Sequence, residues 1–182
     1  MKVLTIIPAK IDSTRLEKKN LQKIGNKTLI EYSIEYAQQS SYDPDIIIST
    51  ESSDVISLAI KNGALGMMRS KKLCGDAEVV DVYLDVINNI TKEYDLVVCL
   101  QPDNPNRSHS FDECIKYMID NNYDDLITVN PNYKRSGSVR IFKFEYLKRG
   151  QVSKRLGCIK DEAIDIHYQE DLERAKLNIN IK

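Results

Sequence analysis

Cationic and polar side chains gather in a short stretch near the start of the chain: Lys10, Ser13, Arg15, Lys18, Lys19 and Asn20. Ammonium and guanidinium groups bind anions, and hydroxyl and amide groups add hydrogen bonds to anionic oxygens. This set predicts a site for an anion that carries several negative charges, and a nucleoside triphosphate is the natural candidate. The alternative is a solvated basic turn that binds nothing.

Glycine-rich phosphate loops do not occur in this sequence. Neither GxxxxGK[ST] nor GxGxxG is present, so the backbone amides of such a loop are not available to cradle phosphates. A bound triphosphate would therefore be held mainly by the side-chain cations of the stretch that follows residue 9.

The cationic stretch directly follows an apolar run over 3–7 that predicts a β-strand. Its apolar residues are mostly consecutive rather than alternating with polar ones, which is typical of a strand buried on both faces at the centre of a parallel sheet. In doubly wound α/β folds, ligands bind beside the loops that leave the carboxyl ends of such strands. The position of the cations thus favours a binding site over a solvated turn.

Helical and strand patterns alternate along the rest of the chain. Helices are expected over 28–39, 55–60, 76–90, 111–120 and 169–177. Further strands are expected over 45–50, 66–68, 95–100, 126–129 and 139–144. Thr28 and Glu31 have the spacing of a capping box, and Ser52 or Ser53 can cap the next helix. The alternation predicts a Rossmann-like α/β fold, a mainly parallel sheet with helices on both faces, in a single domain over 1–182.

The composition is that of an ordinary globular domain. The 182 residues are 42% hydrophobic and carry a formal net charge of -1, so no basic excess suggests nucleic acid as a partner. No apolar run is long enough for a membrane span and no leader is evident, so a cytoplasmic location is expected. The cysteines form no CxxC pair and are expected to be reduced thiols: Cys74, Cys99, Cys114 and Cys158.

The cationic stretch also resembles a known signature. Pro8-Ala9-Lys10, Ser13 and Lys19-Asn20 are similar to the nucleotide-binding motif of the cytidylyltransferases that make CMP-activated acidic sugars, the CMP-sialic acid synthetases and their KDO-activating relatives. Lys10 stands where the family usually has Arg, which keeps the charge but loses the planar fork for bidentate phosphate contacts. Later segments resemble the same family in the same order: 46–51, 62–64, 69–76, 100–107 and 163–172.

The resemblance implies roles for particular residues. Nucleotide contacts are implied for Ala9, Lys10, Ser13, Arg15, Lys19, Asn20, Arg69 and Gln101. Contacts with the sugar are implied for Arg107, Gly137 and Arg140. Asp103 and Asp165 are implied as ligands of Mg²⁺, an ion that prefers oxygen donors and bridges substrate phosphates. The implied catalytic set is Lys10, Lys19, Asp103 and Asp165.

Each of these roles has a simpler alternative. Asp103 lies in Pro-Asp-Asn-Pro, where Asp is also favoured as a turn residue. Asp165 lies between two isoleucines, so it could be the solvent-facing residue of an ordinary strand. Gln101 and Arg107 could contact the base or the sugar, or only hold their own loop.

The activity implied by the resemblance is a cytidylyl transfer with CTP and an acidic sugar as partners. The anomeric hydroxyl of the sugar acid would attack the α-phosphate of CTP and release pyrophosphate, with Mg²⁺ and the loop cations stabilising the charge. The fold implied is that of the nucleotide-diphospho-sugar transferases. Two alternatives stay open, a nucleotidyltransferase that uses another nucleotide or a sugar phosphate, and a nucleotide-binding module without turnover.

The sequence departs from the family in two places. His167 replaces the second Asp of the terminal Ile-Asp-Ile-Asp motif, and neutral imidazole is a poor ligand for Mg²⁺. Residues 130–137 form a short connection where sialic acid synthetases carry an extended arm that exchanges with a neighbouring subunit. A connection of this length cannot reach across such an interface, because each extended residue spans at most about 3.6 Å. A monomer, or a dimer that does not interlock, is expected.

Overall fold

In a computed structural model of the chain, strand β1 (Val3–Pro8) lies inside the main sheet, as its apolar run predicts. It pairs in parallel with β4 (Asp45–Thr50) on one side and with β6 (Leu96–Cys99) on the other. Its side chains alternate between two hydrophobic cores, Leu4 in one and Ile7 in the other, and both are fully buried. Burial on both faces explains why the strand is apolar apart from the buried Thr5.

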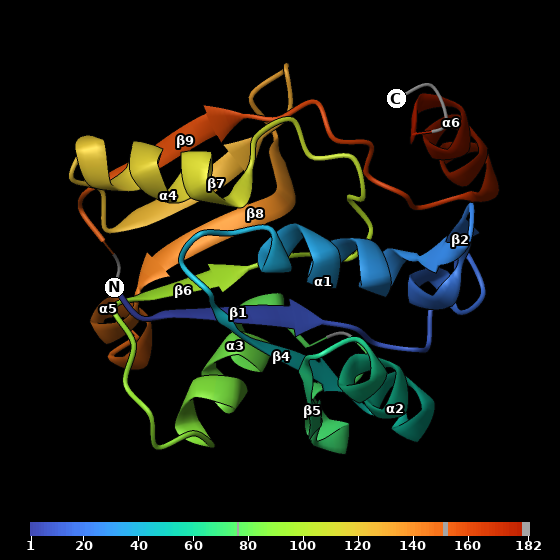
Figure 1. Cartoon of the computed structure of the whole chain (residues 1–182), viewed down its shortest axis with the longest axis horizontal. Helices are drawn as coiled ribbons and strands as arrows, with labels where there is room; N and C mark the ends of the chain where they lie inside the picture. Colours follow the sequence, from blue (N-terminus) through green and yellow to red (C-terminus); the bar gives the residue numbers. More distant parts are fainter. Residues whose placement is uncertain (76, 151–152, 180–182) are drawn as a thin grey trace.

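The structure describes residues 1–75, 77–150 and 153–179. Its main sheet contains seven strands in the order β5-β4-β1-β6-β8-β7-β9 (Figure 1). The remaining strands of this sheet are β5 (Leu65–Met68), β7 (Asp125–Val129), β8 (Arg135–Lys143) and β9 (Leu156–Lys160). Strand β8 is antiparallel to both of its neighbours, whereas the other pairings are parallel. The predicted Rossmann-like, mainly parallel sheet is confirmed.

Helices cover both faces of this sheet, which is also as predicted. They are α1 (Leu29–Gln38), α2 (Ser53–Lys61), α3 (Val79–Asn88), α4 (Phe111–Asp120), α5 (Phe144–Lys148) and α6 (Gln169–Ile179). Helices α1, α2 and α4 pack on one face, and α3 and α5 pack on the other. Helix α6 packs instead against the loop after β1 and the small hairpin of β2 (Lys23–Ile24) and β3 (Lys27–Thr28) (Figure 1). Within the described ranges, no helix combines the length and apolar character needed to cross a bilayer.

The caps predicted for the first two helices form as expected. At the start of α1, the Thr28 hydroxyl accepts a hydrogen bond from the Glu31 N–H at 3.3 Å, and the Glu31 carboxylate accepts one from the Thr28 N–H at 2.7 Å. The Ser52 hydroxyl accepts from the Val55 N–H at 3.4 Å at the start of α2. These contacts satisfy amide groups that have no partner inside the helix, so the two crossovers that follow β1 and β4 begin at defined residues.

Several elements differ from the sequence-based expectation. The hairpin β2–β3, helix α5 and strand β9 were not expected, and residues 163–167 form an irregular extended segment rather than a strand. Helix α3 begins at Val79. Asp76, the expected start of that helix, lies outside the described residues.

A buried carboxylate holds three strands together at the β9 edge of the sheet. Asp124 directly precedes β7, and its side chain is 3% exposed. It pairs with Arg155, which precedes β9, and with Lys143, the last residue of β8, each at 2.8 Å. Hydrogen bonds and charge from Arg155 and Lys143 lower the pKa of Asp124 from 3.8 to about 2.

We expect Asp124→Asn to lower the melting temperature near neutral pH but to have little effect at pH 2. Because the folded-state pKa lies below the unfolded one, the ion pairs stabilise the fold above about pH 4, and this contribution is lost as the pH falls toward 2. Allowing for solvent around Arg155, the effect is about 1–2 kcal/mol, or about 3–6 °C. Melting curves of both proteins at pH 7, 4 and 2 test this, and a pH-independent difference would contradict it.

Candidate active site

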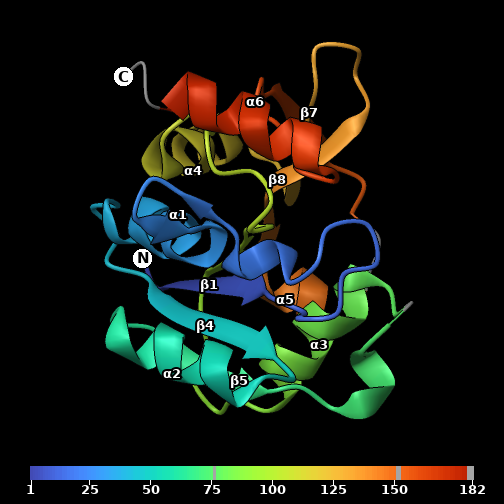
Figure 2. The same ribbon diagram turned by 90° about the vertical axis from the view of Figure 1, so that its right-hand side faces the viewer.

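The carboxyl ends of β1 and β6 lie where the strand order of the sheet reverses. From β1 the chain crosses to β4 and β5, whereas after β6 it continues to β7 and β8 on the other side. The loops after β1 and β6 therefore diverge and leave room for a ligand. Charged and polar side chains line the cleft that opens there: Lys10, Lys19, Asn20, Arg69, Gln101 and Asp103. Figure 2 shows the loop after β1, in blue, between α6 and the α3 segment.

The loop after β1 is anchored at its base and at its tip. The Asn20 amide donates a hydrogen bond to the carbonyl oxygen of Lys10 at 2.9 Å. Leu16 is buried in a hydrophobic cluster that includes Ile166. The Lys10 ammonium reaches across to the carbonyl oxygen of Gly75 at 3.2 Å. Two of the predicted cations, Lys10 and Lys19, therefore face the cleft.

Three other residues predicted to contact nucleotide lie differently. Ala9 is fully buried, and its N–H donates to the Ser49 carbonyl oxygen at 2.9 Å. This bond extends the pairing of β1 with β4 by one residue. Ser13 and Arg15 are absent from the residues that line the cleft. The Arg15 guanidinium lies 5.8 Å from the centroid of the Tyr168 ring. Nucleotide contacts by Ser13 and Arg15 stay predictions.

Arg69 is the buried cation of the site. It directly follows β5 and is 6% exposed. Its Nε donates to the Ser49 hydroxyl at 3.2 Å, and its Nη2 donates to the Ser49 carbonyl oxygen at 2.6 Å. These contacts fix a permanent positive charge in the wall of the cleft, because a guanidinium stays protonated in proteins.

Asp103, Asp165 and His167 form a cluster beside the cleft, and each offers a ligand atom within 4.8 Å of the others. The Lys19 ammonium binds Asp103 Oδ2 at 2.5 Å, and His167 Nε2 lies 2.9 Å from Asp165 Oδ2. Burial and the neighbouring Asp103 charge raise the pKa of Asp165, because both disfavour its ionised form. The cluster therefore carries more negative than positive charge, even with the Lys19 ammonium bound to Asp103.

Backbone contacts bring the distant halves of this cluster together. The N–H of Ile166 donates to the Asp103 carbonyl oxygen at 3.0 Å, and the buried Ile166 side chain packs against Leu172 of α6. The Asp171 carboxylate accepts from the N–H groups of His167 and Tyr168, each at 3.0 Å. Asp165 and His167 are thus held between the loop after β6 and the start of α6.

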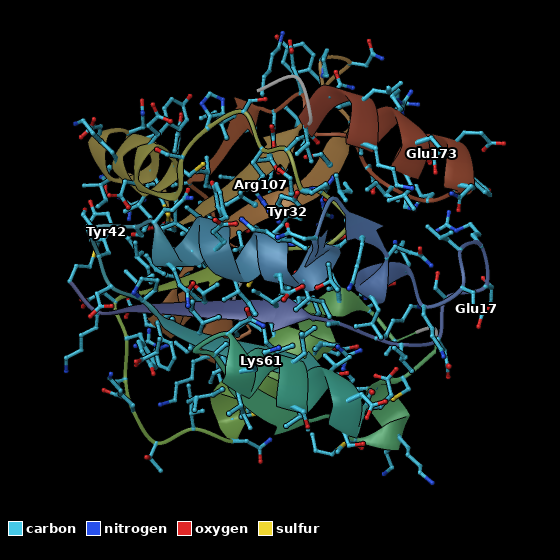
Figure 3. All side chains as sticks on the ribbon, turned by 45° about the vertical axis from the view of Figure 1, so that its right-hand side comes forward. Glu17, Tyr32, Tyr42, Lys61, Arg107 and Glu173 are labelled. Carbon is cyan, nitrogen blue, oxygen red and sulfur yellow. The ribbon has the colours of Figure 1, made fainter. Side chains whose placement is uncertain are left out.

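Both predicted sugar-binding arginines have partners within the protein. The Arg107 guanidinium donates to the carbonyl oxygens of Ser138 at 3.0 Å and Gln101 at 2.8 Å, and it lies over α1, away from the loop that carries Glu17 (Figure 3). Arg140 binds both carboxylate oxygens of Asp125, at 2.8 and 3.2 Å. Arg107 therefore connects the loop after β6 to β8, and the structure does not bring it to the main cleft.

Gly137 and Gln101 lie together at the border of the main cleft. Gly137 has φ +72°, and a Cβ atom there would lie 2.6 Å from Gln101 Nε2. Both residues line a smaller hollow beside the cleft, together with Arg135 and Arg140. Arg135, two residues before Gly137 on β8, was not among the residues predicted for the site.

Comparisons with known proteins show which family the chain belongs to. A family model described as cytidylyltransferase matches residues 4–163, which include both loops of the cleft. The chain belongs to the cytidylyltransferase family. The predicted resemblance to this family is confirmed.

Characterised members of the cytidylyltransferase family are recognisable relatives. The chain is 32% identical to the CMP-N,N'-diacetyllegionaminic acid synthase of Legionella pneumophila, over 66% of this chain and 53% of that protein. It is 35% identical to the pseudaminic acid cytidylyltransferase of Campylobacter jejuni, over 55% of this chain and 45% of that protein. The chain spans about half the length of the curated relatives it matches.

Solved structures share the fold of this cytidylyltransferase. CMP:2-keto-3-deoxy-manno-octonic acid synthetase in complex with CTP superposes with a TM-score of 0.77 at 15% identity, covering 99% of both chains. A cytidylyltransferase from Leptospira borgpetersenii gives a TM-score of 0.75 at 20% identity, covering 100% of this chain and 88% of that one. At these identities the likeness concerns the fold.

Proposed function

We propose that this cytidylyltransferase transfers CMP from CTP to an acidic sugar and releases pyrophosphate, as a single domain. The observation that carries the proposal is the meeting of Lys10 and Lys19 with Asp103 and Asp165 at the point where the strand order reverses. Cations and carboxylates at one cleft are what a triphosphate with a divalent ion requires. The names of the relatives from Legionella and Campylobacter support an acidic sugar as the acceptor.

In this proposal the cations of the cleft bind and orient the triphosphate. Lys10 and Lys19 approach it from the loop after β1, and the fixed charge of Arg69 stabilises it from the opposite wall. Orientation of the α-phosphate toward the sugar hydroxyl supplies much of the rate enhancement, because it converts an encounter into a reaction within one complex. Gln101, held against Gly137, lies where the nucleotide cleft meets the smaller hollow.

The residues present fit a divalent metal ion. Asp103 is 7% exposed, and its Oδ1 is buried without a hydrogen-bond partner among the described residues. Asp103 and Asp165 would hold the ion. When bound, such an ion bridges phosphate oxygens and stabilises the charge that develops on them. A solved structure with the same fold, Rv0371C of Mycobacterium tuberculosis, is a manganese complex; for this chain a divalent ion, Mg²⁺ or a relative of it, is proposed.

The acidic sugar is proposed to bind beside the nucleotide, in the hollow lined by Gln101, Gly137, Arg135 and Arg140. The connection from β7 to β8 is a tight turn in which the Asn130 N–H donates to the Lys134 carbonyl oxygen at 2.8 Å. A turn this short supports a monomer or a dimer without an exchanged arm. We place the activity in the cytoplasm, with small molecules and neither nucleic acid nor membrane as partners.

We expect CTP to stabilise this protein more than ATP, GTP or UTP in the presence of the same divalent ion. A ligand at about 100 times its Kd raises the free energy of unfolding by about 2.7 kcal/mol. For a chain of this length the melting temperature should then rise by about 5–10 °C. Thermal-shift measurements with the four nucleotides test this, and equal shifts would contradict selection of cytosine.

A further inference from the structure

His167 places an imidazole in a cluster that otherwise offers carboxylates. Its ligand nitrogen and the carboxylate oxygens of Asp103 and Asp165 lie within 4.8 Å of one another. The chain contains two histidines, and the other one, His109, lies beside the Lys160 carbonyl oxygen at 2.8 Å. A single imidazole therefore serves this cluster.

The spacing of these groups suits ligands of one ion. His167 Nε2 and Asp165 Oδ2 are 2.9 Å apart. Two ligands at right angles on an ion, each with a bond of about 2.1 Å, are separated by about 3 Å. An ion bound to both atoms could therefore replace their direct contact without moving either side chain far.

One oxygen atom of the cluster lacks the partner that burial normally demands. Asp103 Oδ1 is buried and has no hydrogen-bond partner among the described residues. Lys19 binds the other oxygen of Asp103, so Oδ1 remains available on a side chain that is more than nine-tenths buried. Buried polar atoms without partners call for an explanation such as an ion or a water molecule.

The donor set, two carboxylates and one imidazole, discriminates between kinds of ion. Mg²⁺ prefers oxygen ligands and binds few protein groups, whereas imidazole suits first-row transition metals, which bind nitrogen donors more tightly. A carboxylate at the position of His167 would have made the set all oxygen. The substitution thus changes which ion the site prefers, not only how many charges it holds.

We propose that His167 completes a three-residue site that prefers first-row transition ions to Mg²⁺. Mn²⁺ has the lowest affinity of that series, so it is the most stringent probe of the preference. The proposal rests on the proposed function only in that the same site would serve CTP. It concerns binding of the ion to the protein itself, so it is tested without nucleotide or sugar.

Mn²⁺ binding followed by electron paramagnetic resonance, with Mg²⁺ as competitor, measures the preference directly. The wild-type protein is expected to bind Mn²⁺ more tightly than Mg²⁺, with an affinity ratio above one. His167→Asp should reduce that ratio several-fold, and His167→Ala should weaken Mn²⁺ binding by a similar factor. His109→Ala is the matched control and should change neither value.

Proton NMR gives a second readout that does not depend on affinity. Mn²⁺ at a small fraction of the protein concentration should broaden the imidazole signals of His167 and leave those of His109 sharp. Equal affinity for the two ions, an unchanged ratio in His167→Asp, or broadening of both histidines alike would overturn the proposal. If His167-dependent Mn²⁺ selection is found but CTP does not bind, the metal site stands and the proposed function fails.

Discussion

Asp165→Asn is expected to lower kcat by about a hundred- to a thousandfold and to leave the melting temperature unchanged or slightly higher. Asn keeps the shape of the side chain but removes the charge that would hold a divalent ion at the triphosphate, and one electrostatic group of this kind has effects of that size. Burial and Asp103 raise the pKa of Asp165, which means that its ionised form is disfavoured in the fold. Removing the charge therefore relieves repulsion in the metal-free protein.

Initial rates of pyrophosphate release and melting curves of the same preparation separate the two effects. Asp120→Asn is a suitable control, because Asp120 is an exposed carboxylate at the end of α4 that pairs with Lys116. It should behave as the wild type in both measurements. Full activity in Asp165→Asn, or a loss of activity that follows a loss of folded protein, would contradict the assignment.

Lys19→Met is expected to destabilise the metal-free protein by about 3 kcal/mol, which is about 6–12 °C in melting temperature. Lys19 and Asp103 are 15% and 9% exposed, so removal of the ammonium leaves a buried carboxylate without its partner. Since the ammonium also competes with any cation for Asp103, the variant should bind Mn²⁺ more tightly than the wild type in the absence of nucleotide. Its affinity for CTP should fall, because a cation of the triphosphate site is lost.

A double-mutant cycle tests whether the cost comes from Asp103. Adding Asp103→Asn to Lys19→Met should restore most of the lost stability, since no buried charge then remains unpaired. Lys18→Met is the matched control: Lys18 is an exposed neighbour of Lys19 and is absent from the residues that line the cleft. A loss of stability in Lys19→Met that Asp103→Asn does not reduce would show that the pair has little energetic importance.

The sequence predicted the parts of the fold in which local pattern and tertiary burial agree. The apolar run at Leu4 to Ile7 became a strand buried on both faces, and Thr28 with Glu31 became a capping box. The core of the doubly wound sheet can be predicted from such segments, because burial on both faces and helix capping each require particular residue types at particular positions.

Two other parts of the fold could not be predicted from local sequence pattern. Residues 163–166 alternate like a strand, yet their amides bind side chains and loops: the Ile164 N–H donates to Asn106 Oδ1 at 2.9 Å and the Ile166 N–H to the Asp103 carbonyl oxygen at 3.0 Å. The hairpin β2–β3 has two residues in each strand and therefore no periodicity. The contacts of residues 163–166 depend on tertiary structure, and the hairpin is too short to show a pattern.

The structure brings more of the residues predicted for the nucleotide than of those predicted for the sugar into the main cleft. Lys10, Lys19 and Asp103 do meet in one cleft, whereas Arg107 and Arg140, chosen for the sugar, contact Gln101 and Asp125 within the protein. The sequence does not indicate whether the guanidinium of an arginine will bind a group of the protein or stay available to a ligand. The pairing of Lys19 with Asp103 could not be predicted from the sequence either, because it joins the loops that follow two different strands.

The most direct test of the proposed cytidylyl transfer is to incubate the protein with CTP, Mn²⁺ or Mg²⁺, and one sugar acid at a time. The panel is N,N'-diacetyllegionaminic, pseudaminic, N-acylneuraminic and 3-deoxy-manno-octulosonic acid, the acids named in the relatives. Phosphorus NMR then follows the products. We expect a CMP-sugar and pyrophosphate in equal amounts with at least one acid, and no product with Asp165→Asn. Tight CTP binding without a CMP-sugar from any acid of the panel would contradict it.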